Sequence, residues 1–208
     1  MNLDSTQIVV IHDGLISTND PLLVELRIRF GEQNVEYFPS SNPGLEYVLA
    51  NLSSKMVVLL DVNFSHGEKS GFQVFEEIRE RTSLIYVIMI TANDLNTLRT
   101  EDLITLVNHD AFAIESVASD YIKIISLVDK AAHQLEVRVA SVLEQWINLR
   151  SPDEQATQFI MTSDGTKYTL GDLLGEIRQQ SEIGMAVERN ILVLAIDLLT
   201  RQKEKLNG

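Results

Sequence analysis

One stretch decides the fold of this sequence, VVLLDVNFSHGEKSGF, which covers residues 57–72. Four aliphatic residues lead to a single carboxylate, Asp61, and a polar loop follows before an apolar pattern resumes. A buried strand does not ordinarily end on an unpaired charge, because burying a charge without a partner is costly. Asp61 is therefore a candidate functional residue at the end of a strand.

Short aliphatic runs alternate with amphipathic helical windows on both sides of this stretch. Strands that are apolar at nearly every position are typical of a parallel sheet covered on both faces. The alternation predicts an α/β fold, a doubly wound five-stranded parallel sheet. The predicted strands cover residues 7–12, 34–38, 55–60, 84–90 and 111–114, and the predicted helices cover 19–30, 40–52, 71–81 and 94–107.

Polar side chains follow several of these strands, at the edge where ligands gather in such folds. Asp13 follows the first strand, Asp61 the third and Thr91 the fourth. Two carboxylates at one edge raise each other's pKa unless a cation is present. Mg²⁺, a hard ion that takes carboxylate and carbonyl oxygens, would resolve this repulsion. With Mg²⁺ bound, Asp61 could attack phosphorus as a carboxylate nucleophile, and the Thr91 hydroxyl could bind the new phosphoryl group.

This set of residues resembles the receiver domain of two-component response regulators over roughly residues 5–130, a flavodoxin-like fold. The resemblance implies that Asp61 is the phospho-acceptor and Asp13 a direct Mg²⁺ ligand. It further implies that Asn63 supplies a metal-binding backbone carbonyl, that Thr91 is the switch hydroxyl and that Phe112 is the switch aromatic. The implied phosphodonor is a histidine kinase or a small phosphodonor.

The sequence departs from the receiver pattern at three places. His12 stands where receivers usually carry a second acid, and Glu115 stands where they carry a lysine. The loop after Asp61 is also longer than usual. If Glu115 points into the site, it disfavours phosphorylation; if it points away, the chemistry survives with weaker switching. Lys69 in the loop is a candidate substitute for the lysine, whereas His66 is expected to be solvated.

A long helix is predicted over residues 117–150, which contain no glycine or proline. Its first half is expected to pack on the sheet, and its second half, from Leu135 onward, to need a partner. That partner is either a second copy, which we favour, or the C-terminal segment. The helix carries a heptad seam, formed by Ile125, Val128, Ala132, Leu135, Val139, Val142, Trp146 and Leu149.

Three parts of the chain follow from this pattern: a receiver domain over 1–130, an extended linker helix over 131–150 and a small interaction module over 151–208. The module is predicted to contain a β-hairpin around Asp164-Gly165, a helix opened by a capping box at Thr169, and a longer helix after Gly184. Residues 151–208 resemble no family.

Composition excludes several classes of protein. The chain has 17 Lys and Arg against 30 Asp and Glu, and the net charge of −13 disfavours a nucleic-acid or anionic-lipid surface. The sequence has no cysteine, so disulfides and thiolate sites are impossible. No apolar run is long enough for a membrane span, and the N-terminal sequence lacks the basic region of a signal peptide. We expect a cytoplasmic protein.

Two functional hypotheses remain open. The leading one is an atypical response regulator in which Mg²⁺-dependent phosphorylation of Asp61 controls dimerisation or protein binding through a module that does not bind DNA. The alternative is a phosphorylation-independent pseudo-receiver that acts as a dimeric scaffold or adaptor. Neither is an enzyme beyond phosphorylation and dephosphorylation of its own aspartate, since motifs for phosphatases, nucleotide-binding loops and hydrolases are missing.

Overall fold

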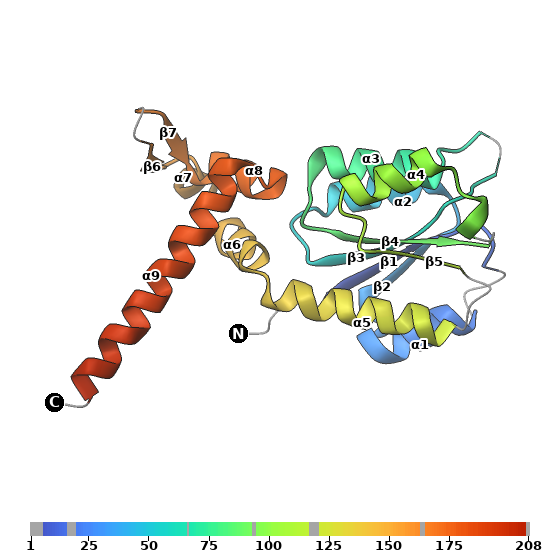
Figure 1. The fold of residues 1–208 in the computed structure, drawn as a ribbon, viewed down its shortest axis with the longest axis horizontal. Helices are drawn as coiled ribbons and strands as arrows, with labels where there is room; N and C mark the ends of the chain where they lie inside the picture. Colours follow the sequence, from blue (N-terminus) through green and yellow to red (C-terminus); the bar gives the residue numbers. More distant parts are fainter. Residues whose placement is uncertain are drawn as a thin grey trace. The chain divides into compact units, whose positions relative to one another are not determined.

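The computed structural model describes residues 6–15, 20–65, 67–92, 95–116, 121–162 and 165–206. The chain forms two compact units, Met1–Val137 and Arg138–Gly208, which are described separately below (Figure 1). The predicted three functional parts stay a prediction, because a division into compact units does not test their roles.

The first unit is built on a five-stranded parallel sheet in the order β2-β1-β3-β4-β5. This order confirms the predicted flavodoxin-like, doubly wound sheet. The strands are β1 Gln7–Ile11, β2 Val35–Phe38, β3 Met56–Asp61, β4 Tyr86–Thr91 and β5 Ala113–Ser116. The helices are α1 Pro21–Phe30, α2 Ser41–Ala50, α3 Gly71–Arg81, α4 Thr100–Asn108 and α5 Tyr121–Val137, with short 3₁₀ turns η1 Glu32–Asn34 and η2 Leu95–Thr97.

Helices cover both faces of this sheet, with α1 and α5 on one face and α2, α3 and α4 on the other (Figure 1). Residues along β3 alternate between the two layers, so that Val57 and Leu59 face α1 and α5 while Val58 and Leu60 face the other layer. All four are fully buried. The apolar run of residues 57–60 is continuous because neither face of β3 is exposed to solvent.

Local sequence signals fix where the helices begin. The Asp20 side chain accepts a hydrogen bond of 2.9 Å from the Leu22 N–H at the start of α1, and Pro21 occupies the first turn. Ser70 and Gln73 form a capping box that starts α3 directly after the Asp61 loop. The loop therefore has a defined end, which holds it above the carboxyl edge of the sheet.

Two predicted elements differ from the structure. The fifth strand is Ala113–Ser116 and not residues 111–114, because the turn after α4, with Asp110 at a φ of 53°, occupies the chain up to Phe112. The helix predicted over 94–107 begins only at Thr100, since residues 95–97 form the separate turn η2. Glu115 consequently lies inside the last strand.

The single long helix predicted over 117–150 is wrong at Arg138, where the backbone is extended (φ −76°, ψ 123°) between α5 and α6 Val139–Asn148. Two β-branched residues, Val137 and Val139, flank this position and favour the helix less than straight side chains do. The first half of the seam packs in the core of the first unit as predicted. Leu135 belongs to that core too, so the prediction that it needs another partner is wrong.

The second unit contains α6, α7 Pro152–Gln155, an antiparallel pair of strands, and two more helices. The strands are β6 Gln158–Met161 and β7 Lys167–Thr169, and the helices are α8 Leu170–Gln179 and α9 Glu182–Leu206. The predicted two-stranded hairpin and the Thr169 capping box are both present, with Asp172 as the reciprocal partner; Asp164 lies outside the described residues. The longer helix was predicted to begin after Gly184, but α9 begins at Glu182 and includes this residue. A side chain at position 184 would overlap the Glu176 carbonyl of α8, so the close approach of the two helices requires glycine there.

Helix α6 buries a different face from the one that the seam predicted. Ala140, Glu144 and Ile147 are buried, whereas Val142 is half exposed and Leu149 is 83% exposed. The buried face packs against α8 and α9 within the same unit. The C-terminal segment is therefore a partner of α6, which was the less favoured of the two predicted alternatives.

A buried ion pair lies in this interface, and it makes the stability of the second unit depend on pH. Glu144 Oε1 is 2.7 Å from Arg178 Nε, and burial raises the pKa of Glu144 despite the attraction of Arg178. A raised folded-state pKa means that the folded unit holds this proton more tightly, so stability falls as pH rises above the ordinary pKa of glutamate. We expect Glu144→Gln to flatten this fall. Urea unfolding at several pH values between 4 and 7 measures the free energy of unfolding. A pH dependence equal to that of the wild type would contradict the raised pKa of Glu144.

Candidate functional site

The candidate site lies beyond the carboxyl ends of β1 and β3. The parallel register pairs Ile11 with Leu60, so His12 and Asp61 are the next neighbours across the two strands. His12, Asp13 and Asp61 each offer a ligand atom, and these atoms lie within 4.8 Å of one another. They line an open pocket of about 360 Å³ together with Gly14, Asn63, Phe64, Ser65 and Ala92.

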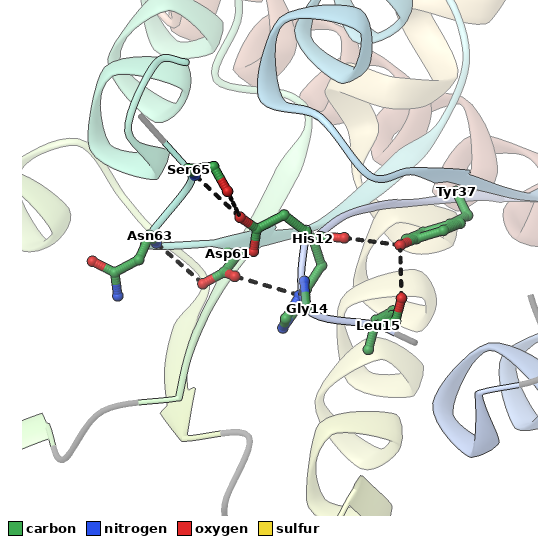
Figure 2. A network of polar contacts seen from close by, with 8 residues as sticks. His12, Gly14, Leu15, Tyr37, Asp61, Asn63 and Ser65 are labelled. Carbon is green, nitrogen blue, oxygen red and sulfur yellow. Dashed lines mark hydrogen bonds and ion pairs between the residues drawn. The ribbon is translucent and has the colours of Figure 1, made fainter. Parts of the chain in front are cut away.

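Asp61 is the most deeply buried acid of this group, with 5% of its surface exposed. Its Oδ1 accepts a hydrogen bond of 3.1 Å from the Asn63 backbone N–H (Figure 2). Burial raises the pKa of Asp61, and the neighbouring Asp13 raises it further, whereas His12 and the Asn63 N–H lower it. The net rise means that the ionised carboxylate has less favourable solvation here than in water. A cation beside Asp61 would reverse this effect.

His12 approaches the carboxylate from β1 (Figure 2). Its Nδ1 lies 3.4 Å from Asp61 Oδ2 and accepts a hydrogen bond of 2.9 Å from the Gly14 backbone N–H. Its Nε2 is buried and has no hydrogen-bond partner among the described residues. The imidazole is thus fixed in position, but its hydrogen bonding is incomplete.

Asp13 is exposed and holds the loop that follows β3. Both the backbone N–H and the hydroxyl of Ser65 donate to Asp13 Oδ2, at 3.1 and 3.0 Å. Further along the loop, the Glu68 carboxylate accepts a hydrogen bond from the Ser41 N–H at the start of α2, which lowers the pKa of Glu68. Two carboxylates, those of Asp13 and Glu68, therefore tie the long loop to β1 and α2.

The two proposed switch residues, Thr91 and Phe112, lie at opposite ends of β4. Thr91 ends β4 and is fully buried. Alternation along β4 puts it on the face of Met89, away from that of Ile90. Phe112 precedes β5, and its ring is centred 4.9 Å from the ring of Tyr86 at the other end of β4. Five residues of strand span about 17 Å, so the structure does not bring Phe112 to the site edge. Its role as a switch stays a prediction.

Glu115 shares the α5 side of the sheet with Asp61 but stands two strands away. Asp61 pairs with Ile90, and Ile90 pairs with Glu115, which corresponds to about 10 Å between the two acids along the sheet. Glu115 is buried, and its Oε2 lies 2.6 Å from Lys123 Nζ on α5. The carboxylate is therefore charge-paired by a lysine and does not face the pocket of Asp61.

Lys69, the loop residue that was considered as a substitute for the missing lysine, does not line the pocket of Asp61. Lys69 Nζ lies 2.7 Å from a carboxylate oxygen of Glu77 on α3, so the structure places it in a surface ion pair. His66 lies outside the described residues. Among the described residues, the basic side chain that lies beside Asp61 is therefore the imidazole of His12 and not Lys69.

The site residues fit a divalent cation. Two oxygen-bearing side chains and an imidazole converge at one open pocket. Burial and the neighbouring Asp13 raise the pKa of the Asp61 carboxyl group despite the attraction of His12, and a bound cation would oppose this rise. The Asn63 backbone lines the same pocket, although its predicted role as a carbonyl ligand stays a prediction.

Sequence reasoning missed three contacts here: Ser65 with Asp13, Glu68 with Ser41, and Lys123 with Glu115. Each joins residues that are far apart in the chain or on different elements, and no short motif encodes such a pair. The sequence showed that the loop after Asp61 is unusually long, but it gave no signal for these contacts.

Comparison with known proteins supports the fold and leaves the chemistry open. No protein-family model matches the sequence, and no curated protein matches it significantly. Among solved structures, the N-terminal domain of an uncharacterized protein from Wolinella succinogenes is 12% identical, with a TM-score of 0.50 over 62% of this chain and 94% of that chain. NtrX from Brucella abortus is 14% identical, with a TM-score of 0.51 over 69% of this chain but only 34% of that one.

A CheY-like response regulator receiver domain protein from Methanospirillum hungatei is 16% identical, with a TM-score of 0.49 over 64% of this chain and 97% of that chain. At these identities the likeness concerns the fold alone. With its 2-1-3-4-5 strand order and two helical layers, the first unit has the flavodoxin-like fold of response-regulator receiver domains. Within the described residues, none of the helices has the length and apolarity that crossing a bilayer requires.

Proposed function

We propose that this protein is an atypical response regulator that accepts a phosphoryl group on Asp61 with Mg²⁺ and passes the signal to its C-terminal unit. The observation that carries the proposal is the convergence of Asp61, Asp13 and His12 at one open pocket on the carboxyl edge of a receiver-fold sheet. Asp61 offers a carboxylate that is fixed by the Asn63 N–H and faces a space large enough for a phosphoryl group.

The chemical step is a transfer between two oxygen or nitrogen nucleophiles. A carboxylate oxygen of Asp61 forms a bond to the phosphorus of the donor, and the bond from phosphorus to the donor's leaving group breaks with its electron pair. The donor is a small acyl phosphate or the phosphohistidine of a kinase. Asp13 and Asp61 would hold Mg²⁺, which would supply positive charge beside the phosphoryl oxygens. The Asn63 N–H keeps the attacking carboxylate oriented.

The position of Glu115 supports this proposal, because the carboxylate is not placed to repel a phosphoryl group on Asp61. Its charge is balanced by Lys123, and it is separated from Asp61 by Ile90. Thr91 is buried, so its hydroxyl would have to move toward the pocket to reach a phosphoryl group. Such a movement would serve as the switch. Treatment of the protein with acetyl phosphate and Mg²⁺, followed by intact mass measurement, tests the proposal.

The output of the proposed switch is protein association through the second unit. That unit contains an apolar groove of about 380 Å³ whose lining includes Val142, Trp146, Phe159 and Ile191. Helix α9 adds exposed aliphatic residues on several faces, which is unusual for a helix that stays in water. They are 48–67% exposed and comprise Leu192, Val193, Leu194, Ile196, Leu198 and Leu199. We propose a second copy of the chain as the partner, and we assign no nucleic-acid or membrane partner.

The same groove favours a second candidate function, a pseudo-receiver that forms a dimeric scaffold without phosphorylation. The missing second acid at His12 is the observation that supports it, because a weaker Mg²⁺ site would leave Asp61 unmodified. The two candidates differ in one respect. A scaffold associates equally well with Asp61→Asn, whereas a regulator changes its association when Asp61 is phosphorylated.

We expect Val142→Glu to abolish self-association in either case. Val142 is 50% exposed and lines the groove, so a charge there would be buried at the contact at a cost of several kcal/mol while the monomer stays folded. Light scattering after size exclusion measures the mass. Ile28→Glu, on a residue that is 74% exposed in the first unit, is the matched control and should leave the mass unchanged. A wild-type protein that is monomeric at all concentrations would contradict the assignment. Leu135→Glu is unsuitable, because Leu135 is a core residue.

A further inference from the structure

The loop residue Ser65 brings two hydrogen-bond donors to the pocket of Asp61. Its backbone N–H and its hydroxyl both donate to the same oxygen, Asp13 Oδ2, at 3.1 and 3.0 Å. Two donors of one residue that converge on a single anionic oxygen form a small anion-binding clip, and hydrogen bonds to an ionised acceptor are stronger than neutral ones. Ser65, Asp13 and Asp61 line one pocket. The Asp13 carboxylate therefore occupies a place that also suits an oxygen of another anion.

The backbone of Ser65 is held from its other side as well. The Glu68 N–H donates to the Ser65 carbonyl oxygen at 3.3 Å, and the Glu68 carboxylate accepts the Ser41 N–H at the start of α2. These contacts do not involve Asp13, so they would remain if Asp13 gave up its place in the clip. Donors that are fixed in advance need little rearrangement when a negative charge arrives beside them.

A phosphoryl group on Asp61 would bring a second anion next to this clip. The ligand atoms of Asp13 and Asp61 lie within 4.8 Å of each other, and both Ser65 donors reach the Asp13 side of that gap. A phosphoryl group carries about two negative charges, whereas a carboxylate carries one. The Thr91 hydroxyl is fully buried and would have to move to meet this charge. The Ser65 hydroxyl is already in the pocket.

We propose that Ser65 is a phosphoryl-binding residue, whose N–H and hydroxyl hold Asp13 in the resting protein and donate to a phosphoryl oxygen once Asp61 is modified. This inference rests on the proposed function and adds a residue to it. Asp13 becomes the weaker acceptor when it is a metal ligand, because its charge is then shared with the cation. The phosphoryl oxygen, which has the larger charge, becomes the better acceptor for both donors.

The test compares the full-length wild type with Ser65→Ala, using acetyl phosphate and Mg²⁺ as the probe. We expect the initial rate of phosphoryl uptake, followed by intact mass, to fall about tenfold or more, because a donor to the phosphoryl oxygens is lost. Ser65→Thr keeps the hydroxyl and should restore most of the rate. Ser53→Ala is the matched control, because it removes an exposed serine of the same unit, and it should leave the rate unchanged.

Two measurements without a phosphodonor separate this role from a purely structural one. Calorimetric titration should show that Mg²⁺ binds Ser65→Ala no more weakly than the wild type, since Asp13 loses a competing donor. In the wild type, the amide NMR signal of Ser65 should shift when beryllofluoride, which imitates a phosphoryl group, is added to the Mg²⁺-bound protein.

Unchanged uptake in Ser65→Ala, or a Ser65 amide that does not respond to beryllofluoride although the wild type takes up a phosphoryl group, would overturn the inference. Mg²⁺ binding that weakens together with uptake would also overturn it, because Ser65 would then only hold the loop in place. Phosphorylation of Asp61 would still stand after any of these results. A wild type that takes up no phosphoryl group would instead contradict the proposed function itself, and the role of Ser65 with it.

Discussion

Replacing Asp61 by Asn is expected to abolish phosphoryl uptake and, at the same time, to stabilise the metal-free first unit. The carboxylate is the proposed nucleophile, and an amide cannot replace it. In the absence of a cation, the same carboxylate is buried and has a raised pKa, so its ionised form destabilises the fold at neutral pH. Because asparagine carries no charge, we therefore expect the variant to have the higher free energy of unfolding at neutral pH. Stability given up at a functional site is a common trade-off.

Intact mass measurement and urea unfolding of the chelated protein together check this expectation. Asp110→Asn is the matched control, because Asp110 is an exposed acid of the same unit whose left-handed backbone (φ 53°) asparagine also tolerates. It should change neither quantity. A loss of more than about 1 kcal/mol in Asp61→Asn would show that the carboxylate stabilises the metal-free unit through a further contact. That result would contradict the proposed cost of burying Asp61.

Gly71→Ala is expected to have the largest effect on stability. Gly71 is the first residue of α3, and a Cβ there would overlap the backbone carbonyl oxygen of Asp61 and come within 2.9 Å of Val62 Cα. The clash is with backbone on both sides, so no side chain can move to relieve it. Because the Gly71 N–H also donates to the Val62 carbonyl at 3.0 Å, the end of β3 and the start of α3 would have to separate. We expect a loss of about 3 kcal/mol and a site that binds metal poorly.

Hydrogen exchange of the β3 amides measures this loss in the first unit alone. Gly175→Ala is the matched control, because Gly175 is a helical glycine with no neighbour near its missing Cβ. Alanine there should stabilise α8 by about 0.5–1 kcal/mol. Wild-type protection of the β3 amides in Gly71→Ala would show that the close approach between α3 and Asp61 is not needed.

The fold of the first unit was predictable because its signals are local. Continuous aliphatic runs such as residues 57–60 identify strands buried on both faces, and the capping box at Ser70 marks the start of the next helix. The break at Arg138 was not predictable from periodicity. The apolar spacing continues across it, and the break is recognisable only from the packing of Ala140, Glu144 and Ile147 against α8.

The candidate site was predictable to the level of the strand ends that carry it. Asp13 and Asp61 could be placed together because the ends of neighbouring parallel strands meet. The charge pairing of Glu115 could not be predicted, because it depends on Lys123. Lys123 lies on the following helix, and no motif links the two residues. Phe112 was misplaced relative to its strand for a similar reason, because the turn after α4 took up two more residues than its composition indicated.

The most direct test of the central claim is the mass of the wild-type protein after incubation with acetyl phosphate and Mg²⁺. We expect the addition of one phosphoryl group, mapped by peptide fragmentation to Asp61 and dependent on the metal. Asp61→Asn should show no addition under the same conditions. A wild-type mass that does not change with either acetyl phosphate or a panel of phosphorylated histidine kinases, or a phosphoryl group that maps to another residue, would contradict it.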